Sequence, residues 1–307
     1  MRLDLRRPRI LLVTRKTPLT LLLEQHGTLA QARFYLESRG QDLSEYQETH
    51  ERFQAALTQV LTAIPPDQRR ARVDRDDLDR FLFAPDDVIL IVGPDGLVPN
   101  VAKYLRGQVT IGINPDPERY DGVLCPHPPR ATADLLAWAG RGAGQGYRIQ
   151  RRVMAVAERE DGQRLLALNE VFVGHQSHQS ARYRLRAGDR EERQSSSGVI
   201  CATGTGSTGW VRSIVEQRDL DVPLPQPEEP RLAWFVREPF PSVYTGTALD
   251  FGFLEPGSPL VLRSEMGRGG VLFADGIESD RVEFLDGHTV RIGVADDTLN
   301  LLVPAER

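Results

Sequence analysis

Two short apolar runs that enclose a helical segment set the strongest constraint on the fold. The runs are DDVILIVG (86–93) and GQVTIGIN (107–114), and LVPNVAKYLR (97–106) between them predicts a helix after Pro99. Continuous apolar strands are typical of a sheet buried on both faces, and a strand–helix–strand unit joins parallel strands. RILLVT (9–14) predicts another strand of the same kind. The first part of the chain, residues 1–130, is therefore predicted to be an α/β domain with a parallel sheet.

A long helix is predicted between the first strand and these two runs. Ser44 and Gln47 have the spacing of a capping box, which predicts the start of the helix near residue 44. Apolar residues then recur at helical spacing until Pro65 and Pro66 end the pattern.

Beyond about residue 130 the chain changes to many short β-type runs, which predict stacked antiparallel sheets in a β-rich domain over residues 131–284. RGAGQG (141–146) predicts a flexible turn, and the dipeptides at Asp275-Gly276 and Asp286-Gly287 are both hairpin signals. The β-type runs cover residues 148–157, 165–173, 181–187, 197–203, 231–238, 259–264, 269–276, 280–287, 288–295 and 299–304.

Composition excludes several classes of protein. A net charge of -5 over 307 residues gives no general attraction to nucleic acid or to an anionic membrane. The two cysteines, Cys125 and Cys201, lie far apart and form neither a disulfide framework nor a metal-binding pattern. No apolar run approaches the ~20 residues of a membrane span. We therefore expect a soluble, cytoplasmic protein with no nucleic-acid or membrane partner and no metal-ligand motif.

The stretch VICATGTGSTGW (199–210) places a run of small and hydroxyl-bearing residues directly after a predicted strand. Its glycines allow a ligand to approach the backbone, and a helix that begins near Ser207 would favour an anion. Trp210 would stack on a flat base. A hairpin turn needs only two such residues, so a binding turn is the better explanation. The hydroxyl groups belong to Thr203, Thr205, Ser207 and Thr208, and the glycines are Gly204, Gly206 and Gly209.

Two other segments carry polar groups where a ligand could bind. GPDG (93–96) follows a predicted strand, where ligands of α/β sheets gather, and Asp95 lies between two glycines. Taken alone, this stretch fits a common Pro-Asp-Gly turn better. Asn169 and Glu170 interrupt an apolar strand, so they either bind protein or ligand groups or face water at the strand end. The residues alone leave these two interpretations of Asn169 and Glu170 equal.

Taken in order, these segments resemble the NAD kinase family. Its members carry a GGDG turn after a strand, then NE, then a Gly/Thr/Ser turn before an aromatic residue, and a late DG. The matches here are GPDG (93–96), NE (169–170), GTGSTGW (204–210) and DG (275–276). Longer stretches, such as SSGVICATGTGSTGW (196–210), resemble the animal mitochondrial-type members of the family.

The resemblance implies the two-domain fold of this family, with residues 285–307 returning to the first domain, and a homo-oligomer, expected as a dimer. It also implies transfer of the γ-phosphoryl group of ATP, with Mg²⁺, to the adenosine ribose 2′-hydroxyl of NAD, giving NADP. By this resemblance Asp95 is the general base, and Gly93 and Gly96 shape a phosphate-binding turn. The residues implied to bind the dinucleotide are Asn169, Glu170, Thr205, Gly206, Ser207, Thr208, Trp210 and Ser213.

In one loop the chain departs from the family pattern. The family's GGDGT is GPDGL here, so Pro94 replaces a glycine and Leu97 replaces a threonine. Proline has no N–H and fixes φ near about -65°, which removes one donor from this loop. A catalytically weak or inactive NAD(P)-binding protein of the same fold is therefore the alternative. A kinase of the related diacylglycerol or sphingoid-lipid type ranks third, because NE and GTGSTGW favour a dinucleotide.

Overall fold

The chain divides into two compact units. The computed structural model describes residues 8–141 and 145–305. The first unit comprises residues 1–150 together with 300–307, and the second comprises residues 151–299. β5 (Tyr147–Arg159) and β16 (Thr289–Pro304) each continue from one unit into the other. The units therefore meet between residues 150 and 151 and again between residues 299 and 300. The boundaries expected after residues 130 and 284 lie earlier in the chain.

The first unit is built on a parallel sheet. β1 pairs with β2 and β3, β3 pairs with β4, and the end of β16 joins β4 at Asn300 and Leu301, all in parallel. Every residue of β1 and β3 is buried, as expected for strands covered on both faces. The α/β domain predicted for this part of the chain is confirmed. The strands are β2 (Arg70–Asp74), β1 (Ile10–Thr14), β3 (Val88–Val92) and β4 (Val109–Ile113), in that order across the sheet.

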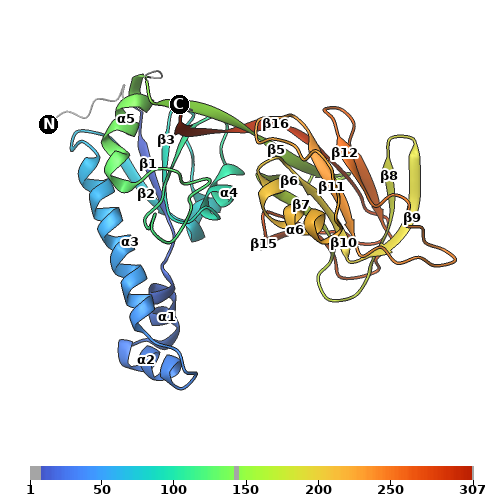
Figure 1. Ribbon diagram of the computed structural model, residues 1–307, viewed down its shortest axis with the longest axis horizontal. Coiled ribbons are helices and arrows are strands. Elements are labelled where there is room, and N and C mark those ends of the chain that lie inside the picture. The colour runs from blue at the N-terminus through green and yellow to red at the C-terminus, as the bar shows by residue number, and fades with distance from the viewer. Residues whose placement is uncertain (1–7, 142–144, 306–307) are drawn as a thin grey trace. The chain divides into compact units, whose positions relative to one another are not determined.

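Helices cover this sheet and extend beyond it. Apolar residues of α3 and α5 share one core with β1, β3 and β4. Figure 1 shows α3 running from this sheet to the pair α1 and α2 at its far end. The helices of the unit are α1 (Pro18–His26), α2 (Leu29–Glu37), α3 (Ser44–Ala63), α4 (Leu97–Ala102) and α5 (Thr132–Arg141), with 3₁₀ turns at Arg75–Arg80 and Pro129–Ala131.

The long helix predicted from near residue 44 to Pro65 is confirmed as α3, but two details of the predicted helix starts were wrong. The capping box of Ser44 and Gln47 is not formed: α3 has Leu43 at its N-cap, and the N–H of Ser44 donates to the carboxylate of Asp42 at 3.0 Å. The helix expected after Pro99 begins at Leu97 instead. Pro99 lies in the first turn of α4, where backbone N–H groups have no partner within the helix, so a proline is tolerated there.

The second unit consists of two stacked sheets that share a core. One sheet is antiparallel, in the order β12-β11-β10-β7-β14-β15, and the other contains β16, β13, β8 and β9, with β5 paired to β6 and β16. Buried residues of both sheets form a single cluster that includes Val199, Trp234, Tyr183 and Leu260. The β-rich fold predicted for this part of the chain is confirmed. Its remaining strands are β6 (Arg164–Ala167), β7 (Glu170–His175), β8 (Ala181–Ala187), β9 (Arg190–Ser196), β10 (Gly198–Ala202), β11 (Leu232–Arg237), β12 (Phe251–Leu254), β13 (Leu260–Ser264), β14 (Gly270–Ala274) and β15 (Ile277–Glu283).

Several local predictions in this unit need correction. Asp275-Gly276 does join β14 and β15 as a hairpin, with φ of 54° and 68°. Asp286-Gly287, however, connects β15 in one sheet to β16 in the other, so it is a turn between sheets. The runs 288–295 and 299–304 belong to one continuous strand, β16.

Two further expectations concern a turn and membrane spans. The turn expected at 141–146 includes residues 142–144, which lie outside the described residues. Within the described part of the chain, no helix is both long and apolar enough to cross a membrane.

Candidate functional site

The turn after β3 is tightly folded around Gly93. The N–H of Gly93 donates to the carbonyl of Ile113, and the N–H of Leu97 donates to the carbonyl of Pro94. Leu97 is fully buried, and a Cβ at Gly93 would lie 2.9 Å from its Cδ2 atom. Gly93 therefore permits the close packing of the leucine. Among the described residues, the N–H groups of Asp95 and Gly96 have no hydrogen-bond partner, so they are the two donors that this turn can offer to a ligand.

The carboxylate of Asp95 connects this turn to the loop after β4. It accepts hydrogen bonds from three consecutive N–H groups, those of Val123 at 2.8 Å and of Leu124 and Cys125 at 2.9 Å. Oδ1 accepts two of these bonds and Oδ2 accepts one. Since an ionised carboxylate has about four acceptor positions, one position on Oδ2 remains for a further donor. Burial, with a smaller contribution from the charge of Asp95, raises the pKa of the Cys125 thiol far above its usual range.

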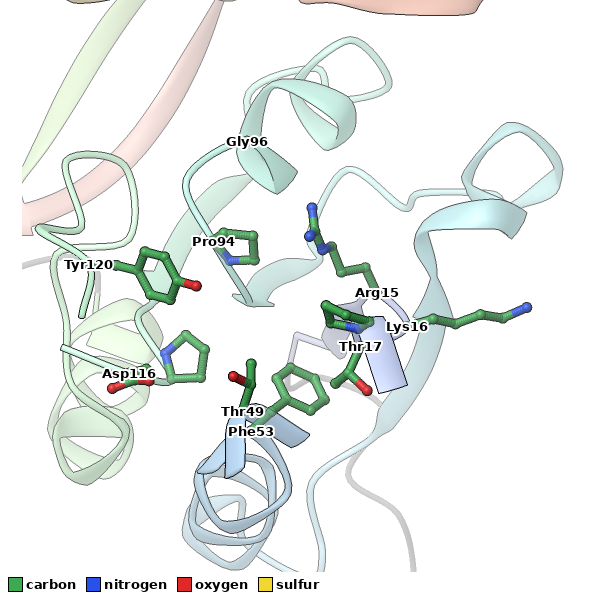
Figure 2. Close-up of a pocket in the computed structure, with 11 residues that line it drawn as sticks. Arg15, Lys16, Thr17, Thr49, Phe53, Pro94, Gly96, Asp116 and Tyr120 are labelled. Carbon is green, nitrogen blue, oxygen red and sulfur yellow. The ribbon is translucent and has the colours of Figure 1, made fainter. Parts of the chain in front are cut away.

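A cavity of about 260 Å³ opens beside this turn, at the carboxyl ends of β1, β3 and β4 (Figure 2). In α/β sheets this edge is where ligands bind. Apolar and aromatic groups make up most of the wall, and the Pro94 ring and the Tyr120 hydroxyl face the hollow. The lining residues are Arg15, Lys16, Thr17, Pro18, Thr49, Phe53, Pro94, Gly96, Pro115, Asp116 and Tyr120.

In the second unit, Asp275 holds the segment that contains Asn169 and Glu170. Its carboxylate accepts the N–H groups of Leu168 at 3.0 Å, Asn169 at 2.7 Å and Glu170 at 3.3 Å. Its own N–H donates to the carbonyl of Glu170 at 3.0 Å. Each unit thus contains an Asp-Gly turn whose aspartate carboxylate accepts hydrogen bonds from three consecutive N–H groups.

The Gly/Thr/Ser turn packs directly on this segment. Thr203 donates its hydroxyl to the carbonyl of Leu168 and its N–H to the carbonyl of Asn169. A Cβ at Gly206 would lie 2.2 Å from that Asn169 oxygen, so only glycine fits at this position. The structure therefore brings Asn169 and the turn together, as a shared binding site would require.

A buried arginine fixes the middle of the same turn. Arg152, which is 5% exposed, donates from Nη1 to the hydroxyl of Thr205 at 3.2 Å. Ser207 and Thr208 donate their hydroxyls to the carbonyls of Thr203 and Thr205. These hydroxyls are consequently fixed by the fold and keep their acceptor positions for a ligand.

Glu170 has the most perturbed environment of the predicted site residues. Burial, and next the charge of Asp275, raise its pKa to about 7. Neither the Asn169 nor the Glu170 side chain has a hydrogen-bond partner within the part of the chain that the structure describes. The two interpretations of Asn169 and Glu170 therefore stay open for their side chains, because the protein contacts these residues only through their backbone atoms.

The aromatic residue of the turn lies on the outer face of the antiparallel sheet. A 3₁₀ turn (Gly206–Thr208) precedes α6 (Trp210–Gln217), so the helix expected near Ser207 begins at Trp210. The Trp210 ring stacks on Phe172 with ring centres 5.8 Å apart, and the Arg237 guanidinium lies 5.0 Å from it. Ser213 is exposed on α6. Base stacking by Trp210 stays a prediction, as does adenine recognition by Thr208 and Ser213.

The structure thus gathers the predicted residues into two sets. Gly93, Asp95 and Gly96 lie together in the first unit, and the residues from Asn169 to Trp210 lie together in the second. Sequence reasoning missed Asp275, Arg152 and Arg15 as site residues, although the Asp275-Gly276 turn was noticed and Thr203 was named among the hydroxyl-bearing residues of the Gly/Thr/Ser turn. Within residues 8–141 and 145–305, no group of three His, Cys, Asp or Glu side chains could hold a metal ion.

Solved structures define the class of fold. The chain is similar to an NAD kinase from Archaeoglobus fulgidus crystallised with ATP, with a TM-score of 0.58 and 19% identity, over 96% of this chain and 92% of that one. It is also similar to yeast NADH kinase crystallised with NADH, with a TM-score of 0.59 and 14% identity, over 99% of this chain and 85% of that one. The chain therefore has the fold of the NAD kinases.

Sequence comparison gives a particular relative. The chain is 28% identical to human mitochondrial NAD kinase 2 over 243 residues, a match that covers 54% of this chain and 55% of the human protein. The match thus spans about half the length of that relative. No family model matches the chain. The resemblance to the NAD kinase family that the motifs predicted is confirmed by the sequence relative and by the fold.

Proposed function

We propose that this protein is an NAD kinase that transfers the γ-phosphoryl group of ATP to the 2′-hydroxyl of the adenosine ribose of NAD. One observation carries the proposal. In a chain with this fold, the Gly/Thr/Ser turn and Asp275 together hold the Asn169–Glu170 segment in one rigid arrangement. That arrangement leaves the Asn169 amide and the Glu170 carboxyl to bind the dinucleotide.

The proposed reaction is an in-line displacement at phosphorus. The ribose oxygen attacks the γ-phosphorus, the bond to the β–γ bridging oxygen breaks, and ADP leaves. Asp95 would take the hydroxyl proton, and its Oδ2 atom keeps one acceptor position for it. Gly93 and Gly96 would shape the turn that holds the donor phosphates, with Mg²⁺ as the partner of those phosphates.

The remaining dinucleotide contacts belong to the same proposal. Thr205, Gly206 and Ser207 would present the rigid turn to the dinucleotide, whereas Thr208 and Ser213 would contact the edge of the adenine. Trp210 would stack on the adenine ring. At present one face of its indole is stacked on Phe172. The cytoplasmic location and the homodimer expected from the sequence are also proposals, which cell fractionation and light scattering would test.

Formation of NADP from ATP, Mg²⁺ and NAD tests the function directly. The full chain should produce NADP, and a reaction without ATP should not. If the chain binds NAD and ATP but forms no NADP under these conditions, the proposed function is wrong.

Asp95→Asn tests the proposed base. The amide cannot accept the ribose proton, so NADP formation should fall about 100-fold or more. The dissociation constant for NAD should stay within about twofold, because Asp95 would contact only the reacting hydroxyl and the other proposed NAD contacts lie in the second unit. Asp134→Asn, at an exposed position of α5 in the same unit, is the matched control. If Asp95→Asn keeps the full rate, Asp95 is not the base.

A further inference from the structure

The cavity beside the GPDG turn contains a half-buried arginine that has no acidic partner. Arg15 follows β1 and lines the cavity, and within the described residues no carboxylate pairs with its guanidinium. Burial, and next the charge of the neighbouring Arg75, lower the pKa of Arg15. An unpaired guanidinium beside a second arginine is costly to bury, so an anion from outside the chain would relieve both effects.

The other charged groups of the cavity are already neutralised within the fold. Lys16 pairs with Glu24 at 2.9 Å and with Asp76 at 3.7 Å. Asp116 pairs with Arg52 at 3.2 Å and with Arg119 at 3.8 Å. Figure 2 shows the Lys16 chain and the Asp116 carboxylate both directed away from the hollow. Arg15 is therefore the charged group of the lining that is left to meet a ligand.

The surroundings of Arg15 fit part of a nucleotide. The Arg15 guanidinium reaches toward Gly96, the N-cap residue of α4, beside the Pro94 turn (Figure 2). That turn offers the N–H groups of Asp95 and Gly96, since Pro94 has none. Phe53 and three prolines contribute apolar surface to the lining of the same cavity. The volume of about 260 Å³ lies below the roughly 300–1,000 Å³ typical of complete small-molecule sites, so the cavity has room for one portion of a larger ligand.

We propose that Arg15 binds the polyphosphate chain of the phosphoryl donor and supplies hydrogen-bond donors in place of the N–H that the proline-containing turn lacks. This assignment rests on the proposed kinase function for the identity of the donor. A guanidinium can bind two phosphate oxygens at once. Arg15 would thus be a binding residue for ATP, and one that contributes nothing to the binding of NAD.

Direct binding measurements test the assignment without any turnover. Calorimetric titration of the full chain with ATP and with inorganic tripolyphosphate should show that Arg15→Gln weakens both by about tenfold to a hundredfold. Arg15→Lys, which keeps a point charge but loses the planar fork, should recover part of that loss. The affinity for NAD should stay within about twofold in both variants. Lys16→Gln is the matched control, since its ammonium group is bound by Glu24 and Asp76.

Thermal unfolding separates a binding role from a structural one. Because the Arg15 charge is unpaired and half-buried, Arg15→Gln should keep or raise the melting temperature in the absence of ligand. The proposal is overturned if Arg15→Gln binds ATP and tripolyphosphate as tightly as the wild type does, or if it lowers the affinity for NAD instead. It is also overturned if the variant lowers the melting temperature together with the affinity for ATP. Absence of ATP and tripolyphosphate binding by the wild type also overturns it. A chain that binds ATP through Arg15 but forms no NADP would reject the kinase function and keep this assignment.

Discussion

At the scale of single residues, Glu170 makes stability depend on pH. Its folded pKa of about 7 lies above the usual 4.5, because partial burial disfavours the ionised carboxyl and the charge of Asp275 adds to this effect. A group whose folded pKa is raised stabilises the fold fully below its unfolded pKa and loses that contribution as pH rises to the folded pKa. For Glu170 this window runs from 4.5 to about 7.

Glu170→Gln should remove this dependence. The amide stays neutral at every pH, so the difference in the free energy of unfolding between the variant and the wild type should grow in favour of the variant as pH rises. The change should reach up to roughly 3 kcal/mol between pH 4.5 and 7. Urea unfolding at a series of pH values measures it. Glu255→Gln, at an exposed position of the same unit, controls for the loss of one charge. A difference for Glu170→Gln that does not vary with pH would contradict the assignment.

Residue types were predicted from the sequence far better than their partners. Asn169, Glu170 and the Gly/Thr/Ser turn were identified because polar or flexible groups interrupted an apolar strand pattern. The role of Asp275 could not be predicted in the same way, since its contacts join residues more than 100 positions apart. Arg15 gave no signal at all, because an arginine after a strand is ordinary until its surroundings show that no acid pairs with it.

At the scale of elements, the β14–β15 hairpin acts on the junction between β6 and β7. The turn of this hairpin places the Asp275 carboxylate against the three N–H groups of Leu168, Asn169 and Glu170. Asp275 has a φ of 54°, in the left-handed region where Asn is tolerated as well as Asp. A change to Asn therefore alters the carboxylate and keeps the turn.

Asp275→Asn should lower the free energy of unfolding by roughly 2–4 kcal/mol, because an amide cannot accept all three hydrogen bonds. It should also weaken the binding of NAD, since the Asn169–Glu170 segment would lose its fixed position. Urea unfolding and calorimetry with NAD measure the two effects. Asp286→Asn makes the same change in the other Asp-Gly turn, where the side chain is exposed, and should alter stability by less than about 0.5 kcal/mol. Equal stability of the two variants would exclude this role for Asp275.

Helices and strands were predicted correctly where burial sets the sequence pattern. The prediction failed where pairing with a strand elsewhere in the chain determines the local structure. The apolar strands β1, β3 and β10 were predicted because both of their faces are buried. β9, with the sequence REERQSS, was not predicted, since its strand state comes from pairing with β8 along its full length. The wrong hairpin at Asp286-Gly287 has a similar cause, because the local turn signal does not reveal which sheet the next strand enters.

At the scale of the whole molecule, the end of the chain stabilises the beginning. Leu302 is fully buried in the core that α3, β1 and β3 form, and its carbonyl is 2.9 Å from Nε2 of His127. The resemblance to the NAD kinases implied that residues 285–307 would return to the first domain. In the structure, β16 supplies residues 289–299 to the second unit and residues 300–304 to the first. Each unit has its own core, so a core substitution should act on one unit.

Leu302→Ala should therefore destabilise the first unit although it lies five residues from the C-terminus. Removing a buried leucine side chain costs about 2–5 kcal/mol through lost burial and the cavity left behind. Hydrogen exchange measured by mass spectrometry should show faster exchange in peptides from β1 and β3, with peptides from β7 and β10 unchanged. Leu82→Ala, in the same unit but 88% exposed, should leave both sets unchanged. Faster exchange confined to β7 and β10 would mean that β16 stabilises the second unit alone. ATP affinity should fall with the first unit's stability while NAD affinity persists, because the proposed donor and dinucleotide contacts lie in different units.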